Sequence, residues 1–446
     1  MNADAINSSS ANSQPVNVGL CGLGTVGGGT LEVLQRNRVI VEASALCQVN
    51  LIHIGARRDN PNCDTTGIKV SRDIFAVAED PDVDILIEVI GGTTIAKDLV
   101  LKAINNGKHV VTANKALIAE HGNEIFAVAE ERGVSVAYEA AVAGGIPIIK
   151  ILREGLAANQ IQWLAGIING TGNFILTEMA QKGRDFADVL AQAQKLGYAE
   201  ADPTFDVEGI DAAHKLVIMA SIAFGIPLQF NDVYTEGITG IEAQDLAYAK
   251  ELGYRIKHLG IARQHSDCIE MRVHPTLIPQ KRLIANVDGV MNAIMVKGDA
   301  VGSTLYSGGG AGAGPTASAI AADVVDIARQ LALGCKPTVP HLGIGAHYVA
   351  PLSVQPMVEL ETGFYLRLNV LDKPGVLSDI TQILSKSGIS IEAVIQKEPE
   401  EEQDHVAVIL LTNRAKEGDV LKAIAQIEAL GNVDGKVARI RVESLS

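Results

Sequence analysis

At 446 residues, the chain is long enough for several domains of about 150 residues each, which excludes a peptide or a single small module. Hydrophobic residues make up 47% of the sequence and charged residues only 20%, a balance that excludes an intrinsically disordered protein. The net charge of -15 argues against a nucleic-acid binder or a protein of anionic membranes, because both need a basic surface. We therefore expect a globular protein that acts on small molecules, with neither nucleic acid nor membrane as a partner.

Neither the cysteines nor the start of the chain indicate export. The cysteines form no CxxC pair, which predicts neither a disulfide framework nor a zinc site and favours the reducing cytoplasm. They are Cys21, Cys47, Cys63, Cys268 and Cys335. Residues 1–15 lack the basic start and apolar core of a signal peptide, so we expect a flexible polar tail. The longest strongly apolar stretch, residues 216–228, is shorter than the ~18 residues of a membrane span and predicts a buried helix.

The first third of the chain alternates between strand-like and helix-like segments. The expected strands lie at residues 16–20, 49–54, 85–89, 109–112 and 134–138. Because helix-like segments separate these strands, we expect a parallel sheet of the α/β class.

The middle of the chain mixes both types of element, which indicates an α+β domain. Strands are expected at residues 162–168, 269–273 and 294–297, and helices at residues 186–196 and 211–224. A glycine-rich stretch at residues 307–315 precedes an alanine-rich helix, and Pro315 and Thr316 suit the start of that helix. We expect the helix to carry the chain back to the first domain.

The end of the chain has a complete cycle of elements of its own. After a turn-rich linker, with a boundary near residue 360, the pattern predicts a βαββαβ plan. Its elements are expected at residues 364–371, 375–387, 389–395, 406–411, 418–430 and 437–442. The acidic run at residues 398–404 is expected to be a solvated hairpin tip.

The first strand runs into a glycine-rich turn. GLGTVG, from Gly22 to Gly27, matches GxGxxG directly after a strand and before a helix, which is the context of the dinucleotide fingerprint. Gly22 and Gly24 would let the backbone approach a pyrophosphate, Gly27 would allow close contact between helix and strand, and the amides of Thr25 and Val26 would face the phosphate charge. The turn therefore predicts a dinucleotide site, with a plain glycine turn as the alternative.

Two arginines follow the second strand, where NAD enzymes usually carry an acidic ribose ligand. The guanidinium groups of Arg57 and Arg58 would instead neutralise a 2′-phosphate, which favours NADP. Their separation from Gly22 exceeds the usual spacing of about 20 residues, so the alternative is a pair of surface arginines.

Polar residues also follow the next two strands. Lys115 places an amine at the carboxyl edge of the sheet, where ligands of α/β proteins bind, and a surface lysine is the alternative. The turn from Gly91 to Thr94 lies beside the same crevice, and we expect this loop to face the cofactor, with Thr93 in contact with it.

The densest group of polar side chains lies at residues 197–215. Glu200 is in a predicted loop, whereas Asp211 and Lys215 are four residues apart on a predicted helix and share a face. A surface ion pair is the ordinary explanation of such spacing. Because the helix continues almost entirely apolar, we instead expect this acid and amine at the edge of a buried site, and we expect His214 to be structural.

Six segments resemble the homoserine dehydrogenase family, in that family's order. They are GLGTVG, TANK, EAAVAGGIPII, GIINGTGNFIL, GYAEADPTFDVEGIDAAHK and GGGAGAGPTASA. The resemblance covers nearly the whole chain after the tail and implies a Rossmann-type dinucleotide-binding domain and an α+β catalytic and dimerisation domain. It also implies the reversible reduction of L-aspartate 4-semialdehyde to L-homoserine with NAD(P)H, on the route to threonine, methionine and isoleucine.

The resemblance implies roles for individual residues. Lys215 matches the proton donor, and Glu200 and Asp211 match the residues that bind homoserine. Lys115 matches a contact of cofactor and substrate and could share the proton transfer. The residues expected to contact the cofactor are Gly22, Leu23, Gly24, Thr25, Val26, Gly27, Arg57, Arg58, Thr93, Lys115, Gly197 and Gly302. A monovalent cation, usually sodium in the family, is implied at the backbone carbonyls of Glu139, Val142, Gly144 and Ile146.

The last segment, with LDKPGVLSDITQIL at residues 371–384, resembles an ACT domain of ferredoxin-like plan. Such domains sense amino acids and usually pair, so the resemblance implies feedback regulation, with threonine as the first candidate effector, and a homodimer or homotetramer. The implied effector pocket includes residues 372–376 and the strand from Ile389, and deletion from about residue 360 is expected to remove the inhibition. No kinase-like half precedes the tail, so we expect the monofunctional form.

These inferences give a set of predicted domain limits. They are a flexible tail at 1–15, an NADP-binding Rossmann domain at 16–150 completed by 306–345, a substrate-binding and dimerisation domain at 151–305, a linker at 346–360 and an ACT regulatory domain at 361–446.

Two other functions fit the sequence less well. A dehydrogenase that forms an acyl phosphate through a cysteine thiolate is disfavoured, because no cysteine lies at residues 197–215. A non-catalytic sensor of NADP and an amino acid is disfavoured by the complete set of Glu200, Asp211 and Lys215.

Overall fold

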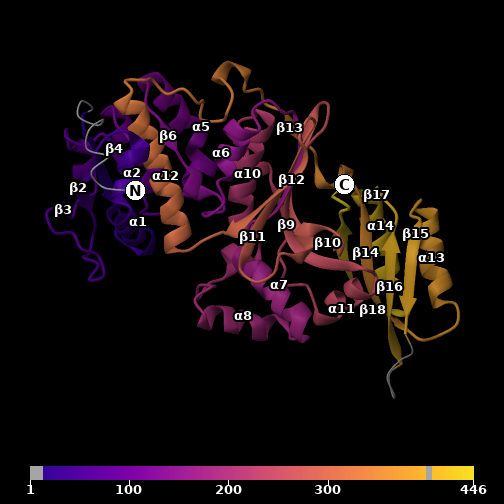
Figure 1. Cartoon of the computed structure of the whole chain (residues 1–446). Coiled ribbons are helices and arrows are strands. Elements are labelled where there is room, and N and C mark those ends of the chain that lie inside the picture. Colours follow the sequence, from indigo (N-terminus) through magenta and orange to yellow (C-terminus); the bar gives the residue numbers. More distant parts are fainter. Residues whose placement is uncertain (1–13, 398–403, 446) are drawn as a thin grey trace. The chain divides into compact units, whose positions relative to one another are not determined.

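The structure is a computed structural model that describes residues 14–397 and 404–445 (Figure 1). The chain divides into two compact units, and each unit combines segments that lie far apart in the sequence. The first unit comprises Met1–Leu164, His214–Asp232 and Asn292–Leu352, and the second comprises Ala165–Ala213, Val233–Met291 and Ser353–Ser446.

A six-stranded parallel sheet forms the centre of the first unit. Its strands are β1 (Val16–Cys21), β2 (Val49–Gly55), β3 (Lys69–Ser71), β4 (Ile85–Glu88), β5 (His109–Thr112) and β6 (Val136–Ala137). The spatial order is β3-β2-β1-β4-β5-β6, and every neighbouring pair is parallel. This is the doubly wound Rossmann order, whose connections reverse direction between β1 and β4. The expected α/β sheet is confirmed, and the short edge strand β3 is an addition that the sequence did not indicate.

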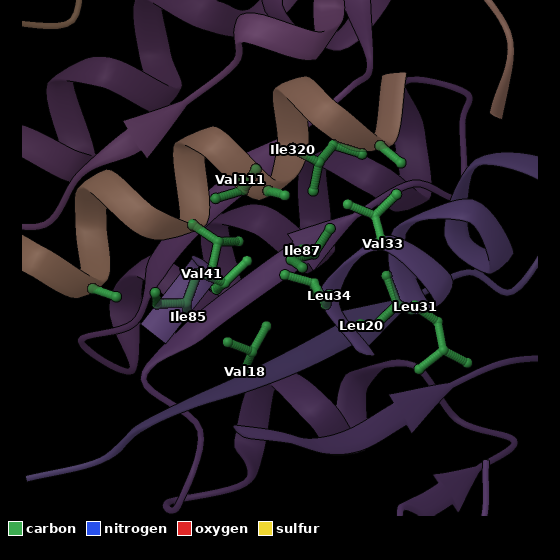
Figure 2. Close-up of a cluster of buried hydrophobic side chains, with 14 of the residues drawn as sticks. Val18, Leu20, Leu31, Val33, Leu34, Val41, Ile85, Ile87, Val111 and Ile320 are labelled. Atoms are coloured by element: carbon green, nitrogen blue, oxygen red, sulfur yellow. The ribbon is translucent and has the colours of Figure 1, made fainter. Parts of the chain in front are cut away.

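Helices connect these strands, and one comes from much later in the chain. The connecting helices include α1 (Thr25–Arg36), α2 (Arg38–Ala45), α3 (Phe75–Glu79), α4 (Thr94–Asn105) and α5 (Lys115–Arg132). The alanine-rich helix α12 (Ala313–Ala332), orange in Figure 1, packs against α1 and α2. Figure 2 shows its Ile320 in one buried cluster with Leu20 of β1 and Ile87 of β4. Burial of each such side chain contributes about 1.5–3 kcal/mol, which holds this distant helix on the sheet.

The first unit also contains the apolar part of helix α10 (Ile210–Phe224) and the neighbouring strands β11 (Met291–Gly298) and β12 (Gly302–Gly309). Residues 216–220 of α10 are completely buried, as the apolar sequence predicts. Within the described residues, no helix is both long and apolar enough to cross a membrane.

The second unit contains the α+β segment and the βαββαβ segment. Its main sheet has the order β9 (Tyr254–Gln264), β10 (Cys268–Pro279), β18 (Val433–Val442), β14 (Glu361–Leu371), β16 (His405–Thr412) and β15 (Ile391–Gln396). Its helices include α7 (Gly170–Lys182), α8 (Phe186–Lys195), α9 (Thr204–Val207), α11 (Ala243–Glu251), α13 (Val376–Lys386) and α14 (Glu417–Glu428). The expected cycle appears as β14-α13-β15-β16-α14-β18, whereas residues 398–403 of the acidic run lie outside the described residues.

The βαββαβ segment shares both its sheet and its core with the α+β segment. Strand β18 pairs in parallel with β10, with Leu277 opposite Val442. Tyr365 of β14 and Leu411 of β16 are buried in one cluster with Ile175 of α7. The last segment is therefore built into the second unit, and removing it would expose part of that unit's core.

Candidate active site

The GLGTVG turn has the geometry that a dinucleotide pyrophosphate requires. Gly22 has φ of +107°, and a Cβ there would lie 2.7 Å from the carbonyl oxygen of Val89. A Cβ on Gly27 would lie 2.0 Å from the carbonyl oxygen of Gly22, so only glycine permits this approach of α1 to β1. Gly24, the N-cap of α1, has open space where its Cβ would point. The amides at the start of α1, including those of Thr25 and Val26, thus border an accessible face that suits a phosphate group.

The turn lies where β1 and β4 end, at the point where the strand order reverses. Val89 donates its backbone N–H to Cys21 across this point, at 3.0 Å. Beyond it, Gly91 and Gly92 both have φ of +74°, and Thr93 precedes α4 as its N-cap. Ligands of open α/β sheets bind in the crevice at such a reversal. Thr93 and the GLGTVG turn therefore both follow strands at the same edge of the sheet, where we expect the cofactor.

A buried carboxylate, that of Glu88, holds the loop after β4 and the end of β5 together. Glu88, at the end of β4, is completely buried and accepts hydrogen bonds from the hydroxyl of Thr112 at 2.5 Å and from the amides of Ile90 and Gly91 at 2.9 and 3.2 Å. Loss of water around the carboxylate raises the pKa of Glu88, and these hydrogen bonds oppose that rise. Glu88 did not stand out in the sequence, because it ends an otherwise apolar strand.

Lys115 is the first residue of α5, and its position is set by Asn114. The Asn114 side chain accepts from the amide of Leu117 at 3.1 Å and donates to the carbonyl of Gly92 at 2.6 Å. It therefore caps α5 and ties that helix to the loop after β4. A lysine in the first turn of a helix is unfavourable for stability alone, which favours a functional reason for Lys115.

Arg57 and Arg58 follow β2 at the same edge of the sheet. Both are exposed, and neither forms an ion pair within the part of the chain that the structure describes. The nearby Asp59 is paired with Arg72, both of its oxygens lying 2.8 Å from one guanidinium nitrogen. The two arginines are thus available to an anion, whereas this carboxylate is already engaged.

In the second unit, one asparagine joins two of the acidic residues. Asn169 lies between β7 (Ile161–Ile167) and α7, and its Nδ2 donates to Asp206 Oδ1 at 2.8 Å and to Asp211 Oδ2 at 2.9 Å. Its Oδ1 accepts from the amide of Gly172 at 2.7 Å and caps α7. Neither Asn169 nor Asp206 was a candidate from the sequence, although an asparagine before Gly-Thr-Gly is a typical helix cap.

Glu200 lies on an exposed loop between α8 and α9, as expected. Gln194 of α8 donates to the carbonyl of Glu200 at 3.0 Å, and Thr171 at the start of α7 donates to the carbonyl of Tyr198 at 2.6 Å. Gly197, at the start of this loop, has φ of +76°. The start of α7 thus holds both the Glu200 loop and the two aspartates.

Helix α10 carries Asp211 and Lys215, which lie one turn apart and are buried, at 5% and 8% exposure. Burial of a carboxylate and an ammonium is costly unless both have polar partners, so this pair is unlike a surface ion pair. His214 is buried beside them on the same helix, stacks on Phe230 with ring centres 4.2 Å apart and lies 3.4 Å from Glu120.

The four predicted carbonyl ligands lie on one sharply bent segment. Ala143 and Gly144 both have positive φ, and Gly145 donates its N–H to the carbonyl of Gly309 at 2.9 Å. The carboxylate of Glu139 caps the start of α6 (Ile148–Lys150) and accepts from the amides of residues 149 and 150, both at 2.9 Å. The Glu139 carboxylate is therefore used in capping α6. The bend at Ala143 and Gly144 sets the directions of the backbone carbonyls of residues 142–146.

The remaining predicted contacts lie on other elements of the first unit. Leu23 is held by Asn60, which donates to its carbonyl at 3.0 Å. Gly302 begins β12 with φ of +74° and has open space where a Cβ would point. The contact of Gly302 with the cofactor stays a prediction.

The first unit has the strand order and glycine-rich turn of a dinucleotide-binding domain, and helix α10 carries a buried acid and a buried lysine. This combination defines the class of NAD(P)-dependent dehydrogenases, here with an additional βαββαβ module. Known protein families match the chain in three places. Residues 22–139 match the NAD-binding domain of homoserine dehydrogenase, residues 147–325 match the homoserine dehydrogenase domain, and residues 364–429 match the ACT domain.

Individual relatives agree with these matches over the full length. The chain is 60% identical to a homoserine dehydrogenase of Pseudomonas aeruginosa over 97% of this chain and 100% of the relative, and 36% identical to that of Bacillus subtilis over 96% and 98%. A solved homoserine dehydrogenase from Thiobacillus denitrificans aligns with a TM-score of 0.92 and 56% identity, covering 97% of this chain and 99% of that one. The chain belongs to the homoserine dehydrogenase family.

Proposed function

We propose that Lys215, Asp211 and Glu200 carry the chemistry of homoserine dehydrogenase in this chain. The reaction is the reversible reduction of L-aspartate 4-semialdehyde to L-homoserine with a nicotinamide cofactor. The observation that carries the assignment is the burial of Asp211 and Lys215 one turn apart at the start of α10, a helix that is otherwise largely apolar. Buried ionisable groups of opposite charge cluster at functional sites, and such a pair can bind the polar groups of a substrate.

The bound nicotinamide supplies the hydride that reduces the aldehyde carbon. Negative charge then grows on the aldehyde oxygen, so the transition state needs a proton donor at that atom. Lys215 gives a proton from its ammonium group to this oxygen, and in the reverse direction its neutral amine takes the proton from the hydroxyl of homoserine. Asp211 holds the ammonium or the hydroxyl in place, and Glu200, on its exposed loop, receives the positive amino group of the substrate.

Lys115 is the second candidate for the proton donor. It lies at the start of α5, at the carboxyl edge of the sheet, where it would contact both cofactor and substrate. We assign it a supporting electrostatic role, because Lys215 is the more deeply buried of the two and its helix also carries Asp211.

Single substitutions separate the two lysines. General acid catalysis contributes about 10²–10⁴-fold, so Lys215→Ala should lower kcat by that factor while cofactor binding, measured by fluorescence titration, persists. Lys182→Ala, which removes an exposed lysine paired with Glu178, is the control and should keep wild-type kcat. A Lys215→Ala enzyme with near-normal kcat, alongside an inactive Lys115→Ala enzyme, would transfer the proton-donor role to Lys115.

The cofactor we propose is NADP, with NAD as the weaker alternative. The guanidinium groups of Arg57 and Arg58 are exposed and form no ion pair with any described residue, which supports a 2′-phosphate, while the neighbouring Asp59 is engaged by Arg72. A solved archaeal homoserine dehydrogenase, 25% identical with a TM-score of 0.60 over 73% of this chain, was determined in complex with NADPH.

A monovalent cation, sodium by preference, is proposed at the carbonyls of Glu139, Val142, Gly144 and Ile146. The bend at Ala143 supports it, since a non-glycine residue with φ of +53° is strained and a bound ion would offset that strain. Carbonyl oxygens are also the ligand type that hard cations prefer. The ion would fix this bend rather than act on the substrate.

The ACT domain is proposed to bind an amino-acid effector, with threonine as the first candidate. Gly375, with φ of +97°, leads into α13, and the amides of its first turn suit a carboxylate. Since ACT domains usually pair, we propose a homodimer or homotetramer. Five cysteines without a disulfide support a cytoplasmic location.

A further inference from the structure

The side chain of Asn169 hydrogen-bonds to both Asp206 and Asp211. Its amide has two N–H donors and one acceptor oxygen. Both donors are directed to carboxylates, at 2.8 and 2.9 Å, and the oxygen accepts the Gly172 amide at 2.7 Å. The opposite orientation of the amide would set its oxygen against two carboxylates, so this network fixes which atom points where.

The local fold brings two negative charges together. Asp206 lies on the short helix α9 and Asp211 in the first turn of α10, with Gly209 between them at φ of +85°. A Cβ on Gly209 would lie 2.9 Å from Val273 and 3.1 Å from His258, so the turn is tightly packed. Because both carboxylates approach the same nitrogen, they repel each other, and the amide donors offset that repulsion.

We propose that Asn169 is a positioning residue for the reaction: its amide sets the orientation of the Asp211 carboxylate before substrate binds. This inference rests on the proposed role of Asp211 in binding homoserine. Asn169 is 6% exposed and is held by the α7 backbone, so it has little freedom to turn. A carboxylate held in this way loses less entropy on binding substrate than one that must choose a rotamer.

The same residue also has an ordinary structural role, which is to cap α7. The two roles use different atoms, because the cap needs only the side-chain oxygen and the aspartates need only the nitrogen. Serine and aspartate are both good helix caps. Neither can donate to the two aspartates as the amide does: serine is too short, and aspartate is an acceptor with a further negative charge.

The experiment therefore compares Asn169→Ser and Asn169→Asp with the wild-type enzyme. Asn169→Ser keeps the cap of α7 and should lower the melting temperature only slightly, whereas Asn169→Asp adds a third carboxylate beside Asp206 and Asp211 and should lower it further. Removing hydrogen bonds to charged groups should lower kcat/KM for homoserine by about ten- to a hundredfold in Asn169→Ser, and by more in Asn169→Asp. KM for the dinucleotide should stay unchanged, a split that a general loss of folding would not give.

Asn173→Ser is the matched control on the same helix. The Asn173 amide donates to the carbonyls of Val287 and Met291, both at 3.1 Å, and contacts neither aspartate in the described structure. This variant should lower the melting temperature and keep the wild-type KM for homoserine. Wild-type kcat/KM for homoserine in both Asn169 variants, or an equal loss in Asn173→Ser, would overturn the inference. A wild-type enzyme that does not oxidise homoserine would instead overturn the proposed function.

Discussion

The hydroxyl of Thr112 donates to the buried carboxylate of Glu88 at 2.5 Å and thereby joins the carboxyl ends of β5 and β4. The same hydroxyl oxygen accepts the amide of Asn114 at 3.0 Å, and Asn114 in turn caps the helix that begins with Lys115. Glu88 holds the amides of the loop after β4. One pair of side chains therefore sets the position of both loops that border the cofactor crevice.

Removing this hydroxyl should weaken both stability and cofactor binding. Thr112→Val keeps the shape of the side chain but removes the hydroxyl that donates to Glu88 Oε2, at a cost of about 1–3 kcal/mol in the free energy of unfolding, while the amides of Ile90 and Gly91 still donate to Oε1. The loosened loop at residues 89–93 should raise the NADPH dissociation constant, as measured by fluorescence titration. Thr112→Ser, which keeps the hydroxyl, is the control. Unchanged NADPH affinity in Thr112→Val would show that the Thr112–Glu88 hydrogen bond does not position the cofactor-binding loop.

The preference for NADP should depend on the arginines after β2. A charge-assisted bidentate contact is worth roughly 1.5–3 kcal/mol, so Arg57→Ala should raise KM for NADPH by about ten- to a hundredfold and leave KM for NADH nearly unchanged. Arg38→Ala, which removes an exposed arginine paired with Glu42 on α2, should change neither value. Equal losses with both cofactors would show that Arg57 does not read the 2′-phosphate.

Some of the site could be predicted from sequence because the required chemistry is local. Gly22 and Gly27 are needed by contacts within one strand–turn–helix unit, and Asp211 and Lys215 share a helix face by spacing alone. Periodicity likewise located nearly every strand of the parallel sheet. The pattern predicted only residues 437–442 of the last strand. Strand β18 begins earlier, at Val433, because its first residues are largely exposed and polar.

The rest depends on contacts between segments that the sequence does not relate. The Asn169 bridge requires the strand–helix junction after β7 to meet the start of α10, and the Thr112–Glu88 pair requires knowledge of which strands are neighbours. Pairing of β18 with β10 was also unexpected, since the pattern of each strand sets its face but not its partner.

Buried Asp323 on α12 should make stability fall as the pH rises. Burial, followed by repulsion from Glu139, raises the pKa of Asp323 from 3.8 to about 8, against the attraction of Lys150 and Arg153. The folded protein therefore holds a proton that the unfolded chain releases, and stability is lost as pH rises towards 8. The histidines whose pKa burial lowers to about 4 are neutral in the folded protein but partly protonated in the unfolded chain near pH 6.5, so they oppose this loss, and the Asp323 effect is the difference between the wild type and a variant without this carboxyl.

Urea unfolding between pH 6.5 and 8 measures this effect. Asp323 should lower the free energy of unfolding of the wild type by up to about 1.4 kcal/mol per pH unit, and Asp323→Asn should lack this loss. Asparagine can still accept the amide of Glu139, which donates to Asp323 at 2.9 Å. Asp326→Asn, at a partly exposed position of the same helix, should keep the wild-type slope. Parallel profiles for wild type and Asp323→Asn would contradict the assignment.

Regulation by the last segment needs a test other than truncation. Deletion from residue 361 would remove Tyr365 and Leu411, which are buried with residues of α7, and would break the pairing of β18 with β10. We expect such a truncated enzyme to unfold at lower temperature and to lose activity for that reason alone. Loss of inhibition in the truncated form would therefore say little about the effector site.

A point substitution at the start of α13 keeps the fold and tests the pocket directly. Asp372 is exposed just before Gly375, so its carboxylate can receive the amino group of an effector whose carboxylate lies at the helix amides. Asp372→Ala should raise the threonine concentration for half-inhibition by about ten- to a hundredfold and leave kcat unchanged. Asp419→Ala, at the start of α14, should keep wild-type inhibition. Unchanged inhibition by threonine in Asp372→Ala would place the effector pocket elsewhere. A wild-type enzyme that threonine does not inhibit would instead point to a different effector or to a purely structural role of this segment.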